Sequence, residues 1–224
     1  MRAHHVLRSI GELLITIGLI LLLFVAYELW VTDLFNHRTQ AKLHGVLERE
    51  WEQHPSGPVI DNVDIGQGIA VLRIPRFGKS YDPVIVEGVG TAALQKGPGH
   101  FPTSALPGAI GNFVVSGHRT TYGKPFERLN EMKTGDKVVI ETRTRWVTYV
   151  VTGKEIVSPS DVGVILPVPR QPSAKPTARL FTFTTCNPKF SASQRLVITG
   201  KMLSDTAKSA GLPPALLPAS AGRS

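Results

Sequence analysis

The single cysteine of this 224-residue chain, Cys186, comes directly after a run of residues typical of a β-strand, and Pro188 ends that run. Without a second cysteine, no internal disulfide is possible. A lone thiol outside the cytoplasm is open to oxidation, so its presence there needs a reason. Catalysis by a thiolate nucleophile is one reason, and burial as a small apolar side chain is the alternative.

Arg195 opens the next apolar run, nine residues after the cysteine. If the two runs form an antiparallel hairpin, Cys186 and Arg195 stand opposite each other and point to the same side of the sheet. The same register pairs Phe183 with Ile198, which is a sensible core pair. A guanidinium beside a thiol favours the thiolate and can donate hydrogen bonds to the oxygen of a tetrahedral intermediate. The alternative is a solvated charge at a strand edge.

His118 follows Gly117 at the end of another strand-like run, residues 112–116. When a cysteine cleaves an amide, the leaving amine needs a proton, and histidine is the side chain suited to supply it near neutral pH. The alternative for a lone histidine is a structural role. The other six histidines all precede residue 101, and the sequence shows no Cys or His pair with zinc spacing. We therefore expect neither a metal nor a cofactor.

Seven short β-type runs occur from Gly68 onward, with Gly, Pro, Asn and Asp between them as turn residues. Many short strands without regular intervening helices predict a closed barrel or a sandwich. Short helices are predicted over 91–96 and 125–131, and a long irregular loop over 158–177. The predicted strands cover 69–74, 83–87, 112–116, 137–142, 146–152, 180–185 and 196–199.

Residues 11–31 are apolar over a length that matches the ~20 residues of a membrane-spanning helix. No small-residue cleavage site follows, so an uncleaved signal anchor is favoured over a cleaved signal peptide. Two arginines precede the span, and the positive-inside rule places residues 1–10 in the cytoplasm and the catalytic domain beyond the span outside the cell.

The chain beyond the anchor divides into a stalk over 32–67, a catalytic domain over 68–203 and a disordered tail over 204–224, which is rich in Ala, Ser, Pro and Gly. In the stalk, apolar residues recur at every fourth position and predict a short amphipathic helix that packs on the domain. These residues are Leu43, Leu47 and Trp51. The net charge of +8 fits nucleic acid, a membrane surface or an anionic cell wall, but the basic residues are scattered and no nucleic-acid motif accompanies them. We therefore expect an ordinary basic surface and no nucleic-acid partner.

At these positions the sequence resembles the sortases. The run 182–186, TFTTC, resembles the family's T-L-x-T-C with Phe in place of Leu, and Arg195 resembles its downstream arginine. The run 116–119, SGHR, is similar to the catalytic-histidine motif. Further runs resemble the class E sortases of actinobacteria, and the resemblance extends over residues 68–203. They are LRIPR at 72–76, LQKGPGHF at 94–101, LPG at 106–108, GKPF at 123–126 and GDKV at 135–138.

The resemblance implies a mostly β fold, an eight-stranded sortase β-barrel with short helices, preceded by an N-terminal transmembrane helix. It implies that Cys186 attacks the threonine carbonyl of a C-terminal sorting signal, LAXTG or LPXTG in type, and that the Thr–Gly bond breaks as a thioacyl-enzyme forms. His118 would protonate the leaving amine and then deprotonate the incoming one, while Arg195 would hold the substrate or the oxyanion. The surface protein would thereby be joined to an amine of a peptidoglycan precursor.

Two more residues are candidates for contact with the substrate. Thr185 adjoins the nucleophile, although β-propensity alone also explains a threonine there. Tyr122 lies four residues after His118. The alternative to substrate contact is an aromatic side chain that lies on the surface of a loop. Two other functions stay open: a peptidase that resolves the thioester with water, and a non-catalytic anchored binding module in which Cys186 belongs to the core.

Overall fold

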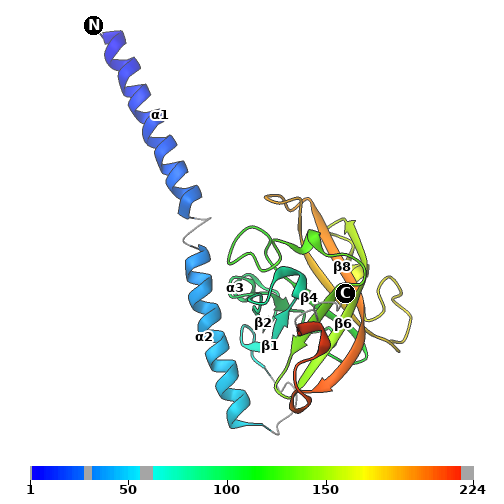
Figure 1. The fold of residues 1–224 in the computed structure, drawn as a ribbon. Coiled ribbons are helices and arrows are strands. Elements are labelled where there is room, and N and C mark those ends of the chain that lie inside the picture. The colour runs from blue at the N-terminus through cyan, green and yellow to red at the C-terminus, as the bar shows by residue number, and fades with distance from the viewer. Residues whose placement is uncertain (1, 28–31, 56–62, 218–224) are drawn as a thin grey trace, which may run out of the picture.

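The structure is a computed structural model and describes residues 2–27, 32–55 and 63–217. Figure 1 shows two helices, α1 (Arg2–Ala26) and α2 (Thr32–Gln53), preceding a β-barrel. Among the described residues, one helix is long and apolar enough to cross a membrane, over His4–Val25. Its apolar side chains are exposed, as expected of a predicted anchor, and at 1.5 Å per residue α1 reaches about 37 Å. Residues 28–31 of the predicted span lie outside the described ranges.

Eight strands close into one barrel in the order β1-β2-β3-β4-β7-β8-β6-β5, with β1 pairing β5 to complete the ring. This confirms the predicted eight-stranded fold. The two-residue β3 escaped prediction because it is too short to show alternation. The strands are β1 (Gly68–Arg73), β2 (Val84–Glu87), β3 (Gly99–His100), β4 (Gly111–Ser116), β5 (Lys137–Glu141), β6 (Arg145–Val157), β7 (Arg179–Asn187) and β8 (Gln194–Ala207).

Short helical turns join the strands. The predicted helices over 91–96 and 125–131 shrink to α3 (Thr91–Leu94) and to the 3₁₀ turn η3 (Leu129–Glu131). The remaining helical segments within the described ranges are single 3₁₀ turns, of which the first two lie between strands and the last two follow β8. They are η2 (Pro75–Phe77), η4 (Val162–Ile165), η5 (Lys208–Ala210) and η6 (Pro214–Leu216).

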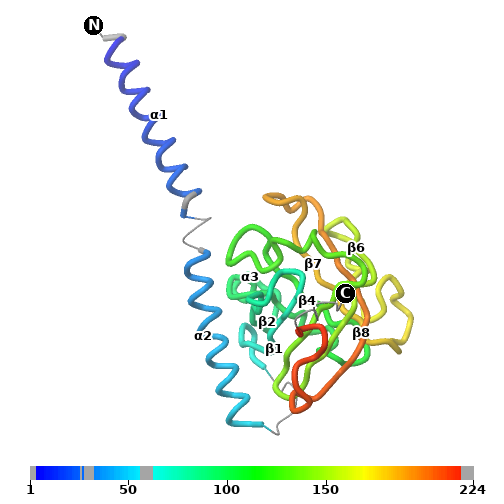
Figure 2. The backbone as a smooth tube through the Cα atoms, in the orientation of Figure 1, coloured from blue at the N-terminus to red at the C-terminus, as the bar shows by residue number. Residues whose placement is uncertain are grey.

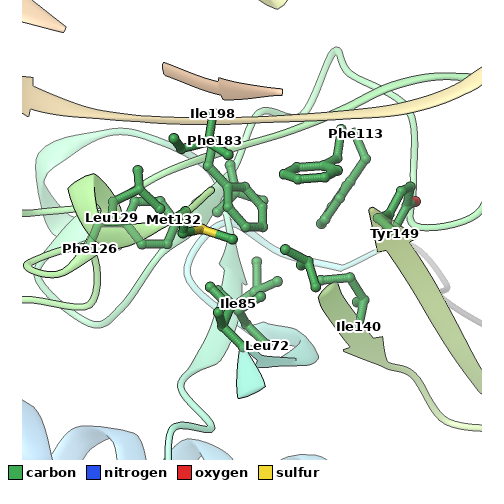
Figure 3. Close-up of a cluster of buried hydrophobic side chains, with 14 of the residues drawn as sticks. Leu72, Ile85, Phe113, Phe126, Leu129, Met132, Ile140, Tyr149, Phe183 and Ile198 are labelled. Atoms are coloured by element: carbon green, nitrogen blue, oxygen red, sulfur yellow. The ribbon is translucent and has the colours of Figure 1, made fainter. Parts of the chain in front are cut away.

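Aromatic and aliphatic side chains from most strands fill the barrel (Figure 3). Phe126 stacks on Phe183 with ring centroids 5.3 Å apart, and Phe183 stands opposite Ile198 on β8. Tyr149 packs at the other end of this core against Phe181. Because side chains of β7 alternate between inward and outward positions, burial of its phenylalanines fixes the register of β7 in the barrel. The same register determines which residues lie at the end of the strand.

The stalk helix α2 packs against the barrel wall, beside β1 and β2 (Figure 1). Leu47 is buried against Val71 and Val84, and Leu43 and Trp51 pack against this cluster. The apolar stripe therefore packs on the domain, as its spacing predicts.

The start of the predicted disordered tail, Ser204, needs correction, because β8 continues to Ala207 and two 3₁₀ turns follow. Pairing with the long strand β6 extends β8, since Thr206 stands opposite Trp146. Lys208 then lies over the ring of Trp51 and donates to Glu141 at 2.7 Å. Composition alone indicated disorder, whereas the pairing with β6 and these contacts order the segment. Residues 218–224 of the predicted tail lie outside the described ranges.

Candidate active site

Cys186 and Arg195 stand opposite each other where β7 ends and β8 begins, as the hairpin register predicts. The thiol is half-buried at the barrel rim rather than enclosed in the core. In a directly opposed pair, the two side chains point to the same side of the sheet. Cys186 and Arg195 therefore share one side of the hairpin at its open end.

His118 reaches the same rim because β4 runs parallel to β7, with Ser116 opposite Thr184. Past this pair, the Gly117 amide donates to the Thr184 carbonyl at 3.2 Å. On the other side of His118, Arg119 Nη1 donates to the Cys186 carbonyl at 3.2 Å. Both neighbours of His118 are thus bonded to the segment that carries Cys186. Figure 2 shows the loop after β4 and the loop between β7 and β8 at the same end of the barrel.

The His118 imidazole is held mainly by packing. Its Nε2 is buried and has no hydrogen-bond partner among the residues that the structure describes. The Tyr122 ring packs on it with centroids 5.1 Å apart and planes tilted by 43°. Burial lowers the pKa of His118 below its ordinary value, because the charged form loses hydration. Burial therefore favours the neutral form of the imidazole over the charged form.

The Arg195 guanidinium is fixed by its own loop. Nη1 donates to the carbonyl of Ala192 at 2.9 Å and to that of Gln194 at 3.0 Å. A guanidinium carries five N–H donors, so this anchoring leaves others that can serve an anionic oxygen. The side chain is partly exposed, which suits contact with an incoming peptide.

Thr185 and Tyr122, predicted to contact the substrate, lie in different settings. Thr185 is buried, and its hydroxyl donates to the Gly117 carbonyl at 2.7 Å. Through this bond Thr185 supports the backbone before His118, and its contact with the substrate stays a prediction. Tyr122 is partly exposed beside His118, and its hydroxyl accepts from Gln95 Nε2 at 3.2 Å.

A second arginine, Arg119, adjoins the thiol and was missed as a site residue in the sequence. Besides the Cys186 carbonyl, it donates to Asn187 Oδ1 at 2.7 Å and to Asn130 Oδ1 at 3.1 Å. Burial lowers the pKa of this guanidinium, and attraction to Cys186 opposes that shift. In the sequence, only the position of Arg119 directly after His118 indicated a role at the site. Its hydrogen-bond acceptors belong to segments that are distant in the sequence.

We expect Arg119→Leu to lower the free energy of unfolding by about 3 kcal/mol, because the charged hydrogen bonds that this buried side chain makes to Cys186, Asn187 and Asn130 are lost. Urea unfolding followed by circular dichroism measures the change. The control is Arg179→Leu, which removes the same charge from an exposed position at the start of β7 and should change stability by less than about 0.5 kcal/mol. Equal losses in the two variants would contradict a special role for Arg119.

A second histidine cluster has the geometry of a serine triad but is structural. His100 Nδ1 lies 2.8 Å from Glu87 Oε2, and its Nε2 lies 2.9 Å from Ser104 Oγ. The Ser104 hydroxyl, however, donates to the Phe101 carbonyl at 2.8 Å and accepts from the Val114 amide. Because His100 is enclosed and the hydroxyl is already engaged, the cluster fixes the loop after β3.

Comparison with known proteins adds an independent line of argument. The family model described as a sortase domain matches residues 72–203. Sortase SrtE1 of Streptomyces coelicolor is 36% identical over 218 residues, which cover 94% of this chain. The chain spans 61% of the length of that relative.

Solved structures agree. The structure of sortase E from Streptomyces avermitilis is 42% identical, with a TM-score of 0.63 over 69% of this chain and 99% of that one. Sortase E1 from Streptomyces coelicolor, solved with a tripeptide in the active site, is 36% identical with a TM-score of 0.62 over 68% and 98%. Since the family model matches more than half of the chain and these relatives agree in sequence and fold, the chain belongs to the sortase family.

Proposed function

We propose that this protein is a membrane-anchored cysteine transpeptidase. It cleaves a C-terminal sorting signal between Thr and Gly and joins the secreted surface protein to an amine of a peptidoglycan precursor. The observation that carries the proposal is the meeting of Cys186, Arg195 and the His118 segment at one rim of the barrel. The fold alone supports no particular chemistry, whereas a thiol with an acid/base and a cation does.

In the acylation step, the Cys186 sulfur attacks the threonine carbonyl and the thiol proton passes to His118. The resulting tetrahedral intermediate carries a negative oxygen, which the free donors of Arg195 stabilise. The C–N bond then breaks, His118 returns its proton to the glycine amine, and a thioester remains on Cys186. Charge balances at each stage, because the proton that leaves the sulfur leaves with the amine.

In the second step, an amine attacks the thioester. His118, now neutral, accepts a proton from this amine, the C–S bond breaks, and His118 passes that proton to the departing Cys186 sulfur. The lowered pKa of His118 suits this step, because a neutral imidazole is the form that can act as a base. Water attacking in place of the amine gives the free acid, so the geometry of the site permits both outcomes.

The anchor supports a site of action at the membrane surface. Tyr27, just after α1, and Asp33, in the first turn of α2, are six Cα–Cα steps apart, a reach of at most about 22 Å. Because α2 lies on the barrel, this short connection limits how far the catalytic domain can move from the bilayer. The two arginines before the span favour a cytoplasmic N-terminus and an extracellular barrel.

The test uses the full chain in detergent with a synthetic sorting peptide, with and without an amine acceptor at saturating concentration. We expect mass spectrometry to find an adduct on Cys186 whose mass equals the peptide truncated after Thr, and the amine-linked product when acceptor is present. Free acid as the sole product at saturating amine would reject the transpeptidase in favour of a peptidase. Absence of any adduct or cleavage would reject both.

A further inference from the structure

The first turn of α2 contacts the loop that follows His118. Asp33 Oδ1 accepts a hydrogen bond from the Gly123 amide at 3.0 Å. Its other oxygen forms an ion pair with Lys124 Nζ at 2.6 Å, and both side chains are partly buried. One carboxylate thus bonds to two consecutive loop residues that lie 90 positions away in the sequence.

The loop segment that Asp33 holds has an unfavourable backbone. Tyr122, Gly123 and Lys124 have φ values of 52°, 75° and 47°, so three consecutive residues occupy the left-handed region. Side chains other than glycine pay a steric cost there, and such conformations persist when surrounding contacts impose them. The fit is close, since a Cβ on Gly123 would lie 2.0 Å from Asn36 Oδ1 on α2.

A second set of contacts links α2 to the Tyr122 side chain. Asn36 is buried and its Nδ2 donates to the carbonyl of Gln95 at 2.9 Å and to that of Lys96 at 3.2 Å. The Gln95 side chain in turn donates to the Tyr122 hydroxyl. The helix therefore contacts the two residues that follow Tyr122 and, through Gln95, is linked to the Tyr122 hydroxyl.

The position of Tyr122 matters because its ring packs on the His118 imidazole. Since that imidazole makes no side-chain hydrogen bond within the described residues, packing has to set its orientation. A catalytic histidine displaced by about 1 Å can lose on the order of 100-fold in rate.

We propose that α2 is part of the catalytic apparatus, with Asp33 as a positioning residue that holds the turn of Tyr122, Gly123 and Lys124 so that Tyr122 orients His118. The proposal rests on the proposed function, in which His118 transfers protons. It gives the segment between anchor and barrel a role in the reaction in addition to its role as a spacer.

The first test needs no turnover. Proton NMR of the full chain in detergent micelles follows the His118 ring resonance, which is identified by its loss in His118→Gln. The Tyr122 ring current shifts this resonance, so we expect Asp33→Ala to move it toward the position of an exposed histidine. Asp33→Asn keeps an acceptor for the Gly123 amide and should move it less. Glu50→Ala removes the same charge from an exposed position on α2 and should leave it unchanged.

The second test is a double-mutant cycle on transpeptidation. We expect Asp33→Ala to lower kcat by about 10- to 100-fold. In a Tyr122→Ala background the same change should have little further effect, because residues that act through one another are not additive. An unmoved His118 resonance in Asp33→Ala, or fully additive losses in the cycle, would overturn the proposal. Absence of turnover in the wild type would instead reject the proposed function and leave the NMR result standing.

Discussion

Replacing Cys186 with alanine is expected to abolish both the peptide adduct and peptide cleavage. The chain holds no other cysteine, so no second thiol can form the thioester. Loss of a covalent nucleophile in an acyl-transfer enzyme costs on the order of 10⁶-fold in kcat. The rate enhancement that is left comes from substrate binding and oxyanion stabilisation. Mass spectrometry after incubation with the sorting peptide, together with the rate of cleavage, measures the loss.

The fold should tolerate this change, which makes the loss interpretable. Cys186 is half-buried at a strand end, and its ladder with Arg195 uses backbone groups that alanine retains. Cys186→Ser serves as a second control, because it keeps a polar group of similar size but has a poorer nucleophile. Cleavage at the wild-type rate in Cys186→Ala would show that the thiol is not the nucleophile and would leave the anchored binding module as the better account.

The sequence was most informative where partners are close along the chain. The β7–β8 hairpin joins neighbouring strands, so alternation of apolar residues was enough to pair Cys186 with Arg195 and Phe183 with Ile198. The stripe on α2 likewise predicted its packing, because a helical period needs no knowledge of the partner surface.

Pairings between distant segments could not be read in this way. His118 reaches Cys186 through the parallel pairing of β4 and β7, whose paired residues lie 68 positions apart. A parallel partner is not set by a turn, so only the resemblance to sortases brought the two residues together beforehand. Arg119 and Asp33 were missed for the same reason, since their bonds to Asn187 and Gly123 join segments that the local pattern leaves unconnected.

Replacing His118 with glutamine is expected to lower kcat/KM by about 10²- to 10⁴-fold, the usual contribution of a general acid/base. Glutamine can form hydrogen bonds but cannot transfer a proton at neutral pH. The loss should fall on amide substrates more than on thioester or activated ester substrates, whose leaving groups need no proton. Steady-state rates on an amide and on a matched ester peptide test this. Equal losses on both would contradict a role in protonating the leaving amine.

The same substitution should also change how stability depends on pH. Because burial lowers the pKa of His118 in the folded protein, the unfolded chain binds more protons than the folded one between that lowered pKa and about 6.5. The contribution of the neutral imidazole to stability is therefore full above pH ~6.5 and is lost as pH falls through the folded-state pKa. Thermal unfolding at pH 7.5 and pH 5 should show a smaller acid-induced fall in Tm for His118→Gln than for the wild type. An equal fall in both proteins would mean that the imidazole is not desolvated, and the neutral base that the second step of the reaction requires would then need another explanation.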